Sequence, residues 1–189
     1  MVRNGAGALK VRIIAMEIGY TVASIYMVFD HLADVKQHLN SRTLSKLCDC
    51  LQDIPDEIPA QQHFHHLTRN YLNFACQNYH LWKMLFEQGA FDQTTWPDWY
   101  AERFNAIFLL IEQHFARFNP AASTIELKQI AKAYLSAIHG VCALGLFMSP
   151  HPERSNGLEI TASLLVDHLI QNWLTLDVQV VKLGNPTKN

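Results

Sequence analysis

The chain has 189 residues, of which 49% are hydrophobic and 17% are charged, and its formal net charge is −2. This composition excludes a disordered chain and provides enough apolar side chains for one domain, or for a small module joined to a larger one. Residues 1–46 carry six basic and three acidic side chains, a net charge of +3 that leaves −5 for the remainder. A basic head on an acidic body is the asymmetry expected when only the head meets a polyanion.

Apolar residues recur at every third or fourth position along nearly the whole chain, which predicts an all-α fold. In chain order, helices are expected over residues 9–18, 22–29, 33–51, 61–78, 80–88, 98–118, 124–148 and 158–176. A tight turn is expected at residues 19–21, and proline and glycine indicate loops at residues 54–59 and 89–97. Ser123 is expected to cap the helix that begins at residue 124.

The first two helices have the spacing of a helix-turn-helix. Such a unit needs a small residue where the helices cross, a residue that tolerates positive φ in the turn, and an apolar residue pointing back into the crossing. Ala15, Gly19 and Ile25 stand at these three places. Thr21 is expected to cap the second helix. The small core between the helices is expected to be completed by Ile14, Ile18 and Val28. By spacing alone, an ordinary helical hairpin remains an equal alternative.

The middle of the chain contains candidates for metal binding, but they do not form a ligand set. His63 and His66 could share one face of a helix, yet no cysteine or nearby carboxylate completes the site, so no metal is expected. The four cysteines include no CxxC pair and are expected to be free thiols. Since no Ser/His/Asp signature, phosphate-binding glycine loop or HExxH motif is present, we expect neither catalysis nor a cofactor.

Nine aromatic residues fall between residues 79 and 108, and most of them are expected in the core. A helical bundle that admits a ligand tends to have an apolar, aromatic pocket with few polar groups. We therefore expect a small apolar or aromatic ligand, flat or elongated, with Tyr134 and His139 as polar anchors. The candidate ligand-binding residues are Trp82, Phe86, Trp99, Phe108, Tyr134 and His139.

The last two long helices carry more apolar surface than one domain needs to bury. Residues 133–148 are almost uninterrupted apolar sequence, but this stretch is too short for a membrane span and contains His139. We expect instead a homodimer in which residues 124–148 and 158–176 of each chain form a four-helix interface. The first eight residues lack the apolar region of a signal peptide, so a cytoplasmic location is expected.

A family resemblance favours the DNA-binding interpretation. The run IAMEIGYTVASIYMVFDHLADVKQHLNSRTLSKL at residues 14–47 resembles the DNA-binding domain of the TetR (tetracycline-repressor-like) family, and the match begins near Gly7 and covers Ala8 to about Leu47. The most specific parts are Ile14-Ala15, Ile18-Gly19-Tyr20-Thr21 and Ile25-Tyr26 followed by Phe29. Residues 78–86 and 133–145, which include His139-Gly140, are similar to a C-terminal ligand-binding domain of one TetR branch. The resemblance implies a dimeric transcriptional repressor that leaves its operator DNA when a small molecule binds the C-terminal domain.

The resemblance also implies which residues meet the DNA. Thr21, Val22 and Ser24 would begin the recognition helix, Tyr26 and Met27 would lie along the groove, and Arg12 would meet the backbone. The hydroxyl groups suit phosphate contacts, whereas Met27 offers only apolar contact, for instance to a thymine methyl group. No arginine or glutamine stands on this helix, so modest base discrimination is expected.

Two departures from the family are visible. Leu32 stands where family members usually place a lysine, which removes one phosphate contact. The family also has a helix before this unit, for which residues 1–8 leave no room, so a shortened head is expected.

The sequence therefore predicts a helix-turn-helix DNA-binding domain at residues 1–46 and a helical ligand-binding and dimerisation domain at residues 47–189. The expected function is that of a TetR-like regulator, acting as a repressor, whose affinity for operator DNA is controlled by an apolar ligand. The alternative is a helical small-molecule-binding or interaction protein that has lost operator binding.

Overall fold

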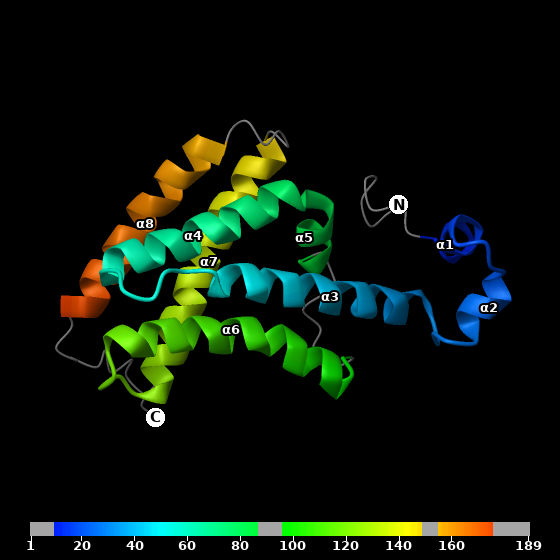
Figure 1. Ribbon diagram of the computed structural model, residues 1–189, viewed down its shortest axis with the longest axis horizontal. Helices are drawn as coiled ribbons and strands as arrows, with labels where there is room; N and C mark the ends of the chain where they lie inside the picture. The colour runs from blue at the N-terminus through cyan, green and yellow to red at the C-terminus, as the bar shows by residue number, and fades with distance from the viewer. Residues whose placement is uncertain (1–9, 87–95, 149–154, 176–189) are drawn as a thin grey trace, which may run out of the picture.

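The computed structural model describes residues 10–86, 96–148 and 155–175, and every regular element in these ranges is an α-helix (Figure 1). The all-α prediction is therefore confirmed for the described part of the chain. Its helices are α1 (Val11–Glu17), α2 (Val22–Tyr26), α3 (Leu32–Gln52), α4 (Ala60–Gln77), α5 (Tyr79–Leu85), α6 (Asp98–Phe118), α7 (Thr124–Met148) and α8 (Ser155–Thr175). In these ranges no helix is long and apolar enough to cross a membrane.

Most helices begin and end within a few residues of the expected positions, and α6 and α7 match them. The start of α7 is fixed as predicted, because the Ser123 hydroxyl accepts a hydrogen bond from the backbone amide of Glu126 at 3.3 Å. The Glu126 carboxylate accepts in return from the Ser123 amide at 2.8 Å, which completes a capping box. The loop expected at residues 89–97 lies mostly outside the described residues.

Helix α3 belongs to both parts of the molecule. At its N-terminal end Leu32 and Val35 pack against α1 and α2, whereas Leu44, Leu47 and Leu51 are buried in the body. Figure 1 shows α1 and α2 at the far end of α3, away from α4, α7 and α8. The domain boundary expected between residues 46 and 47 therefore falls inside a continuous helix. The reason is that the buried leucines keep helical spacing straight through this position.

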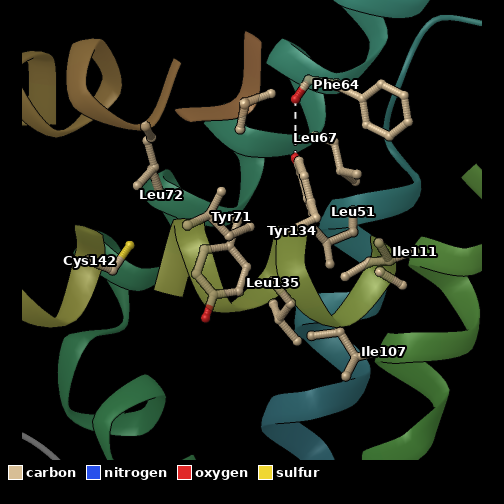
Figure 2. Packing of buried hydrophobic residues seen from close by; sticks show 14 of the residues in the cluster. Leu51, Phe64, Leu67, Tyr71, Leu72, Ile107, Ile111, Tyr134, Leu135 and Cys142 are labelled. Atoms are coloured by element: carbon tan, nitrogen blue, oxygen red, sulfur yellow. Dashed lines mark hydrogen bonds between the residues drawn. The ribbon is translucent and has the colours of Figure 1, made fainter. Parts of the chain in front are cut away.

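The main core lies where α4, α6, α7 and α8 meet the C-terminal half of α3. Figure 2 shows Tyr134 of α7 at its centre, with its hydroxyl directed to the backbone carbonyl of Phe64 at 3.2 Å. The same hydroxyl lies 2.7 Å from the Thr68 hydroxyl, so this buried polar group is satisfied. A second, smaller cluster of Leu44, Leu85, Tyr100 and Phe104 joins α3, α5 and α6.

Candidate functional site

The turn between α1 and α2 has the geometry that the sequence predicted. Ala15 is 2% exposed and Ile25 is 6% exposed, so the small residue and the apolar residue meet in the crossing of the two helices. Gly19 has a φ of 72°, in the left-handed region that favours glycine. The backbone amide of Tyr20 donates to the carbonyl of Ala15 at 2.8 Å and closes the end of α1. These contacts hold α2 against α1.

Helix α2 begins with a side-chain cap. The Thr21 hydroxyl accepts a hydrogen bond from the Ser24 backbone amide at 3.1 Å, as the sequence predicted. It also lies 2.8 Å from the Ser24 hydroxyl. Two of the three hydroxyl groups that were expected to contact phosphates, those of Thr21 and Ser24, therefore already have each other as partners.

Two residues expected in the small core are exposed instead. Ile18, at the C-cap of α1, is 53% exposed. Val28 is 74% exposed, because α2 ends at Tyr26 and the chain turns before residue 28. The amide of Val28 bonds the Ile25 carbonyl in a tightened last turn, which takes its side chain off the expected face. Ile14 packs on this core as predicted. Phe29, Leu32 and Val35 take the places that were expected for Ile18 and Val28.

The other side chains expected to contact DNA lie on the open surface of the head. Met27 is 87% exposed, Tyr26, Val22 and Thr21 are also exposed, and Ser24 is half-buried. Arg12 is exposed on α1, so it comes from the other helix of the pair. The structure thus places five of these residues on α2 or at its caps.

In the body, three of the six expected ligand-binding residues come together. The ring of His139 on α7 lies 4.9 Å from Trp82 and 4.0 Å from Phe86, measured between centroids, and Trp82 and Phe86 lie 5.7 Å apart. Phe86 and Phe108 each pack against both the main core and the smaller cluster, so they mark the seam between them. We call Trp82, Phe86 and His139 the aromatic triad.

A chain of hydrogen bonds orients this triad. The indole N–H of Trp82 donates to the Tyr71 hydroxyl at 3.0 Å, and that hydroxyl lies 3.0 Å from Nδ1 of His139. Since Tyr71 accepts from Trp82, its own proton is available for His139 Nδ1. Burial lowers the pKa of His139 below its ordinary value of 6.5, so the ring is neutral at pH 7. With the Tyr71 proton donated to Nδ1, the proton of the neutral ring lies on Nε2. Sequence reasoning missed Tyr71, which no local pattern distinguishes from a core residue.

The other three expected ligand-binding residues are not part of the aromatic triad. Phe108 packs at the seam, Tyr134 is fully buried and hydrogen-bonded in the main core, and Trp99 stacks on His38 at the surface. For Trp99 the reason is that sequence proximity within residues 79–108 does not determine which face of α6 a residue occupies, and Trp99 lies on the face toward α3.

A groove with a volume of about 410 Å³ lies between α3 and α4. Its walls carry carboxylate, amide and lysine side chains together with the ring of Phe74, and none of the six expected ligand-binding residues. The lining residues are Lys46, Asp49, Cys50, Asp53, Asn70, Asn73, Phe74, Gln77 and Asn78. Two carbonyl groups of α3 and its C-cap, those of Cys50 and Asp53, accept hydrogen bonds from Asn70 at 2.9 and 2.8 Å, so part of this lining holds the two helices together.

The histidines near the start of α4 have a structural partner that the sequence did not indicate. His63 is 2% exposed, and its Nε2 lies 2.9 Å from Nδ1 of His114 on α6. Burial, with the nearby charges of His114, Arg117 and His66, lowers the pKa of His63 to about 4. Among the described residues, no three histidine, cysteine or carboxylate side chains are arranged to hold a metal ion.

One face of α8 is covered and the opposite face is open. Ala162, Val166 and Ile170 are buried in the main core, whereas Ile160 and Leu164 are 66% and 60% exposed. The neighbouring surface of α7 presents Ala133, Ser136, Gly140 and Leu144, all exposed. A Cβ added at Gly140 would meet no atom within 4 Å, so nothing within the described part of this chain requires a glycine there.

Comparison with known proteins places the fold but no activity. No family model matches the chain, and no curated protein matches it. The chain is similar to the solved structure of a protein with unknown function from Rhodococcus sp. RHA1, with a TM-score of 0.61 and 17% sequence identity. The match covers 90% of this chain and 87% of that one. It shows that the helical arrangement is shared over nearly the whole length.

Proposed function

We propose that this protein is a TetR-like transcriptional regulator, a homodimeric repressor whose affinity for operator DNA is controlled by a small apolar ligand. The observation that carries the proposal is the α1–α2 unit, in which Ala15, Gly19 and Ile25 hold a short capped helix across another. This unit stands at the N-terminal end of α3, beyond the helices of the body (Figure 1). A helix presented in this way is the element that helix-turn-helix proteins place in the major groove.

The open face of α7 and α8 supports the homodimer. Ile160, Leu164 and Leu144 form an exposed apolar surface of the kind that marks protein interfaces. The neighbouring small side chains at Ala133 and Gly140 would let a second helix approach closely. A glycine inside a helix destabilises the helix by about 1 kcal/mol relative to alanine. A close approach between the two chains at this position would explain why Gly140 is a glycine.

The aromatic triad supports control by an apolar ligand. It lies beside the seam between two core clusters, where Phe86 and Phe108 pack against both clusters. A ligand that parts these rings would move α6 relative to α3, and α3 carries the head. Neutral His139, held by Tyr71, offers its Nε2–H as a polar anchor within an aromatic environment.

The experiment that tests the proposal is selection of DNA by the full chain from a random duplex library at low salt. We expect enrichment of a sequence with two related half-sites, bound with an affinity that falls as salt rises. Gly19→Val, which places a β-branched residue at a φ of 72°, should lose this binding while the helical content of the body is retained. The proposal is overturned if the protein enriches no sequence beyond the level obtained with a denatured sample of the same protein.

A second candidate, an interaction protein without operator binding, is favoured by one observation. No charged side chain stands between Ile18 and Phe29, so α2 itself provides no attraction to phosphate. The same selection decides between the two functions, because an interaction protein would enrich no sequence at any salt concentration.

A further inference from the structure

The surface of the head is unusually apolar. Seven of its large hydrophobic side chains are exposed, namely Met16, Ile18, Tyr20, Val22, Tyr26, Met27 and Val28. From Ile18 to Phe29 there is no charged residue, and no asparagine or glutamine. This apolar surface therefore differs from that of a recognition helix that binds DNA mainly through basic side chains.

The outer face of α2 consists of two apolar ridges. Ala23 and Met27 are four residues apart on the side opposite the buried Ile25, and the amide of Met27 bonds the Ala23 carbonyl at 3.1 Å, so helical geometry extends to Met27. Val22 and Tyr26 form the neighbouring ridge in the same way. The side chain that projects furthest into solvent is Met27, at 87% exposed.

This arrangement restricts how α2 can distinguish base pairs. Hydrogen-bonded readout in the major groove relies mainly on arginine, lysine, asparagine, glutamine or carboxylates, which are missing from this helix. The hydroxyl of Ser24 is already paired with Thr21. The apolar group that a base pair presents in the major groove is the C5-methyl group of thymine, which alanine and other apolar side chains contact.

We propose that α2 identifies its operator by contact with thymine methyl groups, made by Met27 and Ala23, so that each half-site contains A·T pairs at these contacts. This inference rests on the proposed function and names the feature of the DNA that the head reads. An unbranched, polarisable methionine side chain can adapt to the position of a methyl group, and it has no hydrogen-bonding requirement to satisfy there. Phosphate contacts from Arg12 and from the Tyr26 hydroxyl would set the register.

The test replaces each thymine of the selected half-site with deoxyuridine, which removes the methyl group and leaves base pairing unchanged. At one or two positions per half-site we expect the Kd to rise about fourfold, the equivalent of one methyl group returned to water. Met27→Ala should weaken binding to the thymine duplex and abolish the thymine–uracil difference at one of these positions. Leu109→Ala, an exposed change on α6, should leave the difference intact.

The outcomes separate this inference from the proposed function. If the selected duplex is bound equally well with thymine and uracil at every position, methyl readout is wrong while DNA binding stands. If the difference persists unchanged in Met27→Ala and in Ala23→Gly, the assignment to α2 is wrong. If no sequence is selected, the proposed function fails, and this inference fails with it.

Discussion

The imidazole ring of His38 stacks on the indole ring of Trp99, with centroids 4.6 Å apart and planes 25° from parallel. His38 also contacts Phe29 in a T-shaped arrangement, at 5.4 Å between centroids. Phe29 follows α2, His38 lies on α3 and Trp99 lies in the first turn of α6. The three rings therefore connect the head to the helix that borders the aromatic triad.

Trp99→Ala should destabilise the protein. Stacked aromatic pairs contribute about 1 kcal/mol beyond their buried area, so we expect the free energy of unfolding to fall by at least that amount in a urea titration. Trp99→Phe should recover about half of the loss, because one ring is restored. The matched control is Leu109→Ala, an exposed residue of α6, which should change stability by less than about 0.5 kcal/mol. Equal effects of the two alanine variants would contradict a role for the stack.

The His63–His114 pair should make stability depend on pH. The folded state holds the pKa of His63 near 4, while an unfolded histidine titrates near 6.5. Between pH 4 and pH 6.5 the unfolded chain binds a proton at His63 that the folded chain does not bind. The contribution of His63 to the free energy of unfolding is therefore complete above pH 6.5 and is lost as the pH falls towards 4. The loss approaches about 3 kcal/mol, at about 1.4 kcal/mol per pKa unit.

Urea unfolding at pH 7.5, 6.0 and 4.5 measures this dependence. The double variant His63→Gln/His114→Gln should show a flatter profile, even if its stability at pH 7.5 is lower. If both proteins lose stability in parallel over this pH interval, the loss has another source.

Gly19→Ala should loosen the head selectively. An added Cβ meets no atom within 4 Å, so the cost comes from the left-handed backbone alone and amounts to about 1–2 kcal/mol. Hydrogen exchange should accelerate at the amides of α1 and α2 and stay unchanged in α4 and α7. Gly157→Ala is the matched control, since that glycine lies in open space with an ordinary helical backbone. Uniform acceleration throughout the chain would contradict a local role.

Changes on the open face of α7 and α8 should dissociate the proposed dimer. Ile160→Glu and Leu164→Glu each place a charge on this apolar surface, and Gly140→Leu fills a space that is open in the single chain. We expect all three proteins to sediment as folded monomers. Leu109→Glu, which adds the same charge on α6, should sediment like the unmodified protein. If the unmodified chain is already monomeric at micromolar concentration, this prediction is wrong.

Ligand binding should depend on the aromatic triad. In a thermal-shift screen of apolar compounds, a stabilising compound should lose most of its effect on Phe86→Ala and on His139→Phe, which lacks the Nε2–H. Trp99→Ala should retain the effect once its lower starting Tm is taken into account, because Trp99 has other partners. Stabilisation only by charged, polar compounds would count against an apolar site.

The sequence predicted those features that depend on neighbours along the chain. Ala15, Gly19 and Ile25 occupy their expected places because helix crossing over a tight turn imposes local requirements. Val28 was misplaced because helical periodicity does not indicate where a short helix ends. The residues that cover Ile25 in its place, Leu32 and Val35, come from α3 and depend on how that helix folds back.

Contacts between residues far apart in the sequence could not be predicted from helical periodicity or from local motifs. Tyr71 and His139 are 68 residues apart, and His63 and His114 are 51 residues apart. Each is a residue type common in helical cores, and only the packing of α4 against α6 and α7 makes them partners. The same applies to Trp99, which shares a sequence segment with Trp82 but not its surroundings.

The continuity of α3 has a mechanical consequence. Because Leu44, Leu47 and Leu51 fix the C-terminal half of α3 in the body, the part that carries α2 is the segment from Leu32 to Leu44. At about 1.5 Å per residue this segment is about 18 Å long, so a tilt of about 5° would move its tip by about 1.6 Å. In a two-fold dimer the two segments move in opposite senses, so the tips would separate by about 3 Å against a groove repeat of about 34 Å. A small displacement of the aromatic rings in the body would thus become a larger displacement of the two α2 helices relative to the proposed operator.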